Sequence, residues 1–270
     1  MNGETIRFQR FFGNGQRVVI VAVDHGMFSG PHPGFEDLPA VVTALEAADG
    51  ILMSAGMAKH CHAVFCRRGA PAMILRLNWG TQLCTQWDYQ HGYSVPVLSP
   101  SRALAEGADW ALAGVSLRNL DEATDADNIE VLARLVDEKR QAGIPLIGEP
   151  FPVNAEDARP EDLQELIAIS CRVVAEIGVN AIKTFYTGKG FADIVRSTPV
   201  PILALGARKQ KRERDALELA ASAVRDGARG VVFGRNVVMA REPARFLDAL
   251  LEVVKAGRDP DQIASEYNLS

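Results

Sequence analysis

The chain has 270 residues, of which 47% are hydrophobic and 23% charged, and its formal net charge is -5. This length fits two average domains or one large α/β barrel, and the acidic balance excludes the basic excess that attracts nucleic acids or anionic membranes. The four cysteines form neither a CxxC pair nor a zinc-like quartet, so we expect reduced thiols. Neither a signal peptide nor an apolar run of roughly 20 residues is visible. We therefore expect a cytoplasmic protein with no membrane or nucleic-acid partner.

Apolar runs typical of buried parallel strands alternate with helical patterns along the whole chain. A short polar lead precedes the first of them. The predicted strands are 18–23, 50–54, 72–78, 110–113, 145–151, 181–188, 202–205 and 230–233, and the predicted helices include 37–48, 133–142, 160–177, 213–226 and 242–256. Eight apolar strand runs that alternate with helices, without an obvious linker, predict a single (β/α)8 TIM barrel over 1–270. Residues 257–270 are expected to be a polar C-terminal extension, which is solvated by default.

Polar side chains follow several of these strands. In a barrel of this kind, reactive groups gather at the carboxyl ends of the strands, so these side chains are expected at one mouth. They are Asp24, His25, Arg76, Asn78, Glu149 and Lys183, followed by the loops 206–209 and 234–236.

Lys183 lies in the middle of an apolar strand, where an ammonium is costly unless it is paired, deprotonated or used in chemistry. One interpretation is an internal ion pair or an edge position in water. The other is a Schiff base, which requires a desolvated amine. Strand alternation puts Ala181, Lys183 and Phe185 on one face and Tyr186 on the other, so the tyrosine is a weak candidate partner.

Two carboxylates are candidate partners of the lysine. Asp24 would either cap a helix or pair with a cation, or face the lysine and move protons. Glu149 would be an inward carboxylate near the lysine, or a member of an internal ion pair with Arg76 or Lys183. His25 follows Asp24 by one residue and so points to the opposite side of an ideal strand, which favours a supporting role over that of a base.

The loops after strands seven and eight carry glycine and basic residues, as Gly206-Ala207-Arg208-Lys209 and Gly234-Arg235-Asn236. Glycine lets backbone N–H groups approach an anion, and these loops of α/β barrels often hold a phosphate. The alternative is a solvated basic helix start over 208–214, with only the glycine amides and Arg235 inside.

Taken together, DHG at 24–26, KTFYTG at 183–188, GARK at 206–209 and FGRN at 233–236 resemble the archaeal-type class I fructose-bisphosphate aldolases and their DeoC/LacD-like relatives. Those relatives include synthases of an aminodideoxyheptulosonate and the thiolase that processes phosphorylated autoinducer-2. The resemblance covers about 12–254.

The resemblance implies a (β/α)8 barrel, homo-oligomers, Lys183 as the Schiff-base nucleophile and Asp24 as an active-site carboxylate. It also implies a phosphate cradle made by the amides near Gly206 and Gly234 with Arg235. We add three candidate substrate-binding residues, which are Arg208, Asn78 and His25.

One departure concerns the acid/base residue. The resembling bisphosphate aldolases have a tyrosine before a proline at the end of strand five, where this chain has Phe151 before Pro152. Phenylalanine exchanges no proton, so either Glu149 or another group replaces the tyrosine, or the substrate differs.

The leading hypothesis is therefore a class I aldolase that acts on a phosphorylated ketose or ketone. Lys183, Asp24 and Glu149 would be catalytic, and no metal or cofactor is implied, because the iminium polarises the substrate. The alternatives are a thiolase that passes an acyl group to coenzyme A, and a non-catalytic barrel that binds sugar phosphates.

Overall fold

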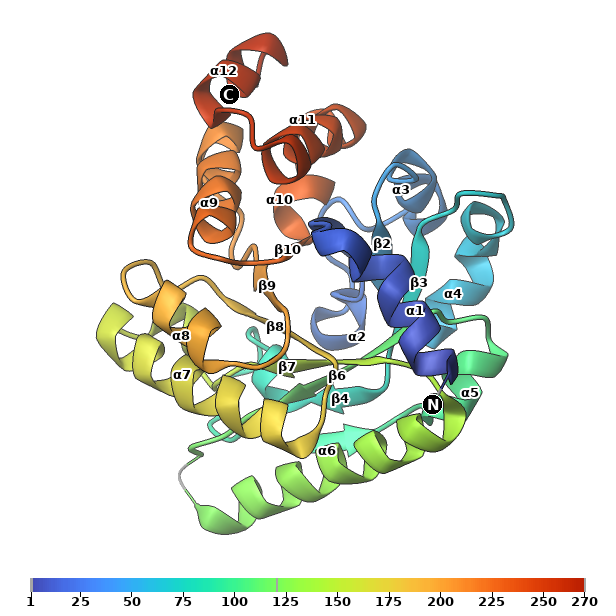
Figure 1. Ribbon diagram of the computed structural model, residues 1–270, viewed down its shortest axis with the longest axis vertical. Coiled ribbons are helices and arrows are strands. Elements are labelled where there is room, and N and C mark those ends of the chain that lie inside the picture. The colour runs from blue at the N-terminus through green and yellow to red at the C-terminus, as the bar shows by residue number, and fades with distance from the viewer. Residues whose placement is uncertain (1, 120, 270) are drawn as a thin grey trace.

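The computed structural model describes residues 2–119 and 121–269. Eight parallel strands close into a barrel in the order β1-β10-β9-β8-β7-β6-β3-β2, with helices around it (Figure 1). The barrel strands are β1 (Val18–Ala22), β2 (Gly50–Met53), β3 (Ala72–Arg76), β6 (Trp110–Val115), β7 (Leu146–Pro150), β8 (Ala181–Phe185), β9 (Ile202–Leu205) and β10 (Gly230–Phe233). The predicted (β/α)8 TIM barrel is confirmed.

The outer helices differ widely in length. The four longest are α6 (Glu122–Ala142), α7 (Pro160–Ile177), α9 (Glu213–Arg225) and α11 (Pro243–Ala256). The short helices are α2 (Gly26–Ser29), α3 (Leu38–Ala44), α4 (Ala55–Cys61), α5 (Pro100–Ala105), α8 (Phe191–Ser197) and α10 (Arg235–Val238). The helix predicted over 133–142 begins earlier, at Glu122, because the Asp121 side chain caps it by accepting a hydrogen bond from the Thr124 amide. Within the described ranges, no helix is long and apolar enough to cross a membrane.

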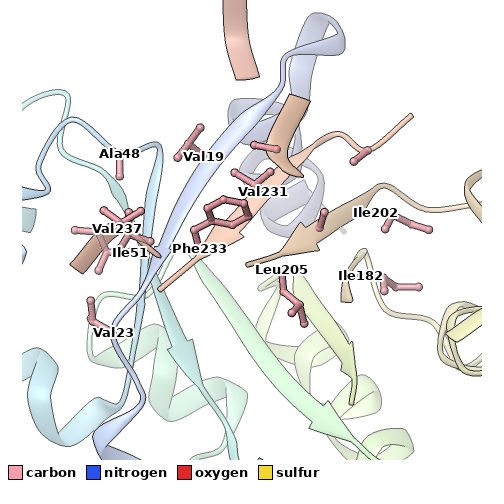
Figure 2. Packing of buried hydrophobic residues seen from close by; sticks show 14 of the residues in the cluster. Val19, Val23, Ala48, Ile51, Ile182, Ile202, Leu205, Val231, Phe233 and Val237 are labelled. Atoms are coloured by element: carbon pink, nitrogen blue, oxygen red, sulfur yellow. The ribbon is translucent and has the colours of Figure 1, made fainter. Parts of the chain in front are cut away.

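Alternate residues of the strands form two apolar layers. One layer fills the barrel interior and includes Ile20, Leu52 and Val232. The other lies between the strands and the helices; Figure 2 shows part of it, with Val19 and Phe233 on neighbouring strands. Because the strands keep this alternation to their carboxyl ends, the next inward position of each strand points into the barrel mouth.

The expected polar lead is instead an amphipathic helix, α1 (Asn2–Phe12), which runs across the strands (Figure 1). The ring centroids of Phe8, Phe11 and Phe12 lie 5.9, 5.3 and 5.6 Å from that of Trp110, the first residue of β6. The helix therefore buries aromatic rings at the amino end of the barrel, and the site expected at the other end stays open.

The third predicted strand, 72–78, is divided in the structure. β3 ends at Arg76, and β4 (Asn78–Gly80) pairs antiparallel with β5 (Ser94–Pro96) outside the barrel. The loop 81–93 between them, which begins with a 3₁₀ turn (Thr81–Leu83), reaches the mouth through Leu83, Thr85 and Gln86. This insertion supplies a wall of the site that strand periodicity does not reveal.

The solvated C-terminal tail expected over 257–270 is wrong for most of its length. Residues Pro260–Glu266 form a further helix, α12, which packs against α9 and α11 (Figure 1). The Asp259 side chain caps this helix, and Ile263 is fully buried. The sequence does not reveal this helix because its apolar face is short and lies within a polar segment.

Candidate active site

Four charged side chains from different strands meet at the carboxyl end of the barrel. Asp24 follows β1, Arg76 ends β3, Glu149 lies in β7 and Lys183 in β8. In each of these strands, the residue two positions earlier belongs to the inner apolar layer. The four side chains therefore form the first charged layer above an apolar barrel interior, as the alternation predicts.

Arg76 is the centre of this cluster. Its Nε lies 2.5 Å from Asp24 Oδ2 and its Nη2 2.6 Å from Glu149 Oε2, and all three side chains are buried. The Phe28 ring lies 4.9 Å from the guanidinium carbon. A planar guanidinium can hold two carboxylates at once, which a single ammonium cannot do with the same geometry. Arg76 therefore fixes Asp24 and Glu149 relative to each other.

Lys183 contacts the second oxygen of Glu149. The distance from Lys183 Nζ to Glu149 Oε1 is 2.5 Å, and the lysine side chain is 9% exposed. Glu149 thus presents one oxygen to Arg76 and the other to Lys183, and both ion pairs considered for it from sequence are present together.

The positive charges of this cluster lower the pKa values of its two carboxyl groups. Burial alone would raise the pKa of Asp24, but the neighbouring Arg76 and Lys183 outweigh it and hold the pKa below its ordinary value. The pKa of Glu149 is lowered in the same way, against burial and the nearby Asp24. Burial would lower the pKa of Arg76, and the two carboxylates raise it instead. Both carboxyl groups are therefore ionised at neutral pH.

His25 also lines the mouth, although strand alternation predicts that it points away. The reason is that β1 ends at Ala22, and His25 already has helical dihedral angles at the start of α2. Its ring packs on Gly234, where any side chain would clash with it. Burial, and to a smaller extent the charges of Arg235 and Lys183, lower the pKa of His25 to about 4 despite the opposing effect of Asp24.

A pocket opens above the cluster. Its lining includes Asp24, His25, Arg76, Glu149, Phe151, Glu156, Lys183, Gly206, Gly234 and Arg235. The Phe151 ring is 8% exposed and packs 4.9 Å from the Phe185 ring, so an apolar ring lies where the resembling aldolases have a tyrosine. The pocket is therefore charged on its floor and apolar on this side.

Tyr186 is not part of this pocket. Its hydroxyl lies 2.7 Å from Asp226 Oδ2, after the end of β8. Burial and the Asp226 carboxylate raise the pKa of Tyr186 to about 12. The sequence interpretation of Tyr186 as a weak partner of the lysine agrees with this position.

Gly206, one of the two glycines of the expected cradle, lines the pocket but offers no free amide. The Gly206 amide donates to the Val232 carbonyl at 3.2 Å, so it belongs to the barrel ladder. A side chain at Gly206 would meet Phe233 at 2.9 Å and Asn236 Nδ2 at 3.0 Å. Asn236 donates to the Gly206 carbonyl at 2.8 Å and holds the loop in place. Gly206 thus allows close packing of this loop rather than offering a free amide.

Arg235 of the expected cradle and the candidate substrate-binding residue Arg208 are separated. Arg235 lines the pocket, with Nη2 2.6 Å from Glu156 Oε1 and 2.9 Å from the Ala207 carbonyl. Arg208 has a side chain that is 57% exposed, and it pairs with Glu156 at 3.0 Å and Asp157 at 2.7 Å. Arg208 lines a neighbouring pocket instead of the one that holds Lys183.

Asn78 also lies apart from the lysine pocket. Its Nδ2 donates to the Gly114 carbonyl at 2.6 Å and its Oδ1 accepts from the Gly114 amide at 2.8 Å. The Asn78 side chain thus takes the place of backbone hydrogen bonds between strands where the chain leaves β3, and it connects β4 to β6. These two hydrogen bonds satisfy the buried Asn78 amide, so its burial does not require a bound ligand.

Sequence reasoning missed one charged residue of the mouth, Glu156, and it left open what Arg76 does there. Arg76 was expected at the mouth as a possible ion-pair partner of Glu149, but its simultaneous contact with Asp24 was not expected. Glu156 belongs to a 3₁₀ turn (Ala155–Asp157) after β7, and no periodic pattern marks it. Among the residues that the structure describes, no group of three His, Cys, Asp or Glu side chains is placed to hold a metal ion.

By its fold and its site, the protein is a (β/α)8 barrel with a cluster of a buried lysine and carboxylates at the carboxyl ends of its strands. The sequence model of a family described as DeoC/LacD family aldolase matches residues 18–240. The chain therefore belongs to the DeoC/LacD aldolase family.

Individual relatives agree with this assignment. An uncharacterized aldolase of Saccharolobus solfataricus is 30% identical over 266 residues, which are 96% of this chain and 97% of that protein. A 3-hydroxy-5-phosphonooxypentane-2,4-dione thiolase of Yersinia enterocolitica is 30% identical over 254 residues, covering 93% and 82% of the two chains.

Solved structures are similar over the same extent. An archaeal fructose 1,6-bisphosphate aldolase superimposes with a TM-score of 0.78 at 28% identity, over 93% of this chain and 98% of that one. A second archaeal structure, with its catalytic lysine covalently bound to the carbinolamine intermediate of the substrate, has a TM-score of 0.77 at 28% identity, over 93% and 99%.

Proposed function

We propose that the protein is a Schiff-base aldolase, in which Lys183 attacks the carbonyl of a phosphorylated ketose or ketone. A carbon–carbon bond next to the resulting imine is then made or broken. The observation that carries this proposal is the position of Lys183, whose Nζ lies 2.5 Å from Glu149 Oε1 at the floor of an open pocket. The solved archaeal relative with a covalently bound lysine supports it.

The lysine must lose a proton before it can attack. Glu149 is the group in contact with it, so we assign proton acceptance to Glu149. The transfer neutralises both members of a buried pair, and desolvation favours neutral forms, which offsets the strong acidity of the carboxyl group. Arg76 holds the other oxygen of Glu149 at 2.6 Å throughout. Glu149 then returns the proton to the carbinolamine oxygen, which leaves as water.

Breaking the carbon–carbon bond requires a second proton transfer. The iminium accepts the electron pair of the bond, and the substrate hydroxyl gives its proton to a base. Phe151 cannot take it, and the carboxylates of the pocket are Asp24, Glu149 and Glu156. Glu149 contacts the lysine, so it is the assigned base, and Asp24 is the second carboxylate on the pocket floor.

The phosphate of the substrate would lie at the rim. Arg235, His25 and Gly234 line this side of the pocket, and Arg235 is the cation among them at neutral pH. Assembly into homo-oligomers and a cytoplasmic location remain predictions.

Borohydride trapping tests the proposal. The protein is incubated with a panel of phosphorylated ketones, reduced and digested, and the adduct is mapped by mass spectrometry. We expect one adduct, on Lys183. Lys139 is a matched internal control, because it is also buried and paired, with its Nζ 2.7 Å from Glu4 Oε1, but does not line the pocket. An adduct on another residue would contradict the role of Lys183, and no adduct with any ketone would leave a barrel that only binds sugar phosphates.

A thiolase reaction is the second candidate. Two observations favour it, namely the relatives that are named as thiolases and the phenylalanine at position 151. In this reaction the lysine adduct would be cleaved with transfer of an acyl group to a thiol. Product formation that depends on coenzyme A would support this reaction, whereas turnover that is unaffected by coenzyme A would exclude it.

A further inference from the structure

An acidic side chain of the protein itself lies where the mouth is expected to bind an anion. Glu156 has a side chain that is 6% exposed, and its two oxygens contact two arginines. Glu156 Oε1 lies 2.6 Å from Arg235 Nη2, and Oε2 lies 3.0 Å from Arg208 Nε. A charge-assisted pair of this kind is among the stronger interactions in a protein. The cation at the pocket rim is therefore already neutralised by a carboxylate of the chain.

Arg235 nevertheless keeps a donor without a partner. Its Nε is buried and makes no hydrogen bond with any described residue, while Nη2 is shared between Glu156 and the Ala207 carbonyl. An unpaired buried N–H is costly. The guanidinium of Arg235, a residue that lines the pocket, is thus only partly satisfied by the carboxylate.

Glu156 also stands between two chambers. It lines the pocket of Lys183 and a second, polar pocket of about 150 Å³, together with Phe151 and Thr85. Arg208 lines only the second pocket, where Asp157 Oδ1 holds its Nη2 at 2.7 Å. If Glu156 were displaced from Arg235, Arg208 would be its remaining partner on the other side.

We propose that Glu156 is a displaceable internal anion, which competes with the phosphate of the substrate for Arg235 and so lowers the affinity of the site for phosphate. This inference rests on the phosphorylated substrate of the proposed function. A phosphate dianion carries more charge and more acceptor oxygens than a carboxylate, so it displaces Glu156 toward Arg208. A neutral ketone offers no charge to Arg235, so Glu156 stays in place and that ligand gains nothing at the rim.

The variant Glu156→Gln separates this role from a structural one. It keeps the shape of the side chain and removes its charge, so the competition with phosphate ends. We expect inorganic phosphate, titrated by calorimetry at constant ionic strength, to bind the variant about tenfold more tightly than the wild type. The reason is that a neutral side chain at position 156 makes a weaker hydrogen bond with Arg235 than the carboxylate does, and so competes less with phosphate. Glu156→Ala, as a second variant, should show the same direction.

Asp157→Asn is the matched control. It removes a carboxylate from the same turn that touches Arg208 but not Arg235, so we expect a change in phosphate affinity of less than about twofold, as for an exposed pair. Equal or weaker phosphate binding by both Glu156 variants, an equal gain in Asp157→Asn, or no phosphate binding by any of the proteins would overturn the proposal.

The outcome is independent of the chemistry at the lysine. Phosphate affinity is measured without turnover, whereas the proposed function depends on trapping at Lys183. Tighter phosphate binding by Glu156→Gln together with failed trapping would leave the competition intact and remove the aldolase reaction. Trapping at Lys183 with unchanged phosphate affinity would do the reverse.

Discussion

Replacing Arg76 by methionine tests whether this side chain holds the charged floor of the pocket together. Methionine keeps an unbranched chain in the buried position but leaves Asp24 and Glu149 without the cation that they share. Breaking a buried ion pair typically costs about 3–5 kcal/mol, because the remaining charge stays buried without its partner. We expect Arg76→Met to lose about 4 kcal/mol of unfolding free energy at neutral pH. For a chain of this size, that loss lowers the melting temperature by about 10 °C.

The pH dependence of this loss has a definite sign. In the wild type, the folded-state pKa values of Asp24 and Glu149 lie below the ordinary 3.8 and 4.5, so both carboxylates contribute stability that is present above those values and lost as the pH falls through the folded-state values. Without Arg76, burial still disfavours the charged forms and Lys183 is left to oppose it, so both pKa values should rise relative to the wild type. The variant then gains stability relative to the wild type as the pH falls, so the difference between them shrinks toward pH 4.

Urea unfolding followed by circular dichroism between pH 4 and 8 measures both effects. The matched control is Arg134→Met on the outer face of α6, where Arg134 pairs with Glu130 at 2.6 Å and both side chains are more than half exposed. We expect that control to lose less than about 0.5 kcal/mol. A loss in Arg76→Met no larger than in the control, or a loss that is constant with pH, would refute the reasoning.

Three further predictions concern single side chains. Phe151→Tyr restores a hydroxyl at the pocket wall, and we expect its rate of fructose 1,6-bisphosphate cleavage to exceed that of the parent in a coupled assay; an unchanged rate would assign the proton transfer elsewhere. His25→Gln removes a group with a pKa of about 4 instead of 6.5, so the wild type should lose up to about 3 kcal/mol more than the variant between pH 6.5 and 4, which unfolding curves at each pH would show. Ile263→Ala should cost about 2–4 kcal/mol in denaturant unfolding because the side chain is fully buried, whereas Ile169→Ala at an exposed position should change stability by less than about 0.5 kcal/mol.

The barrel and the floor of its site could be predicted because both depend on strand alternation. Each barrel strand is a short apolar run, and its inward set continues from the apolar interior to the charged mouth. Knowing the face of Lys183 and Glu149 was enough to expect them near each other, since neighbouring strands β7 and β8 carry them.

The rim could not be predicted, because it is made by segments without a period. The loop 81–93 and the turn that carries Glu156 are positioned by contacts between distant parts of the chain. A sequence pattern gives the face of a residue but not the partner across the barrel. For the same reason, Arg208 and Asn78 were expected at the lysine pocket, whereas their contacts lie in the neighbouring pocket and in the frame between β4 and β6.

Burial and pairing alone do not single out a nucleophile, because two lysines in the described part of the chain, Lys139 and Lys183, are both buried and paired. Lys139 pairs with Glu4 and also donates to Asn180 at 2.8 Å, so loss of its proton would leave the carboxylate without a cation. Lys183 differs because its partner, Glu149, is also held by Arg76. Arg76 therefore keeps Glu149 in place when the Lys183 ammonium is no longer present to hold it. Lys183 also lines the pocket, which Lys139 does not, and this access from the pocket is why we propose Lys183 as the nucleophile.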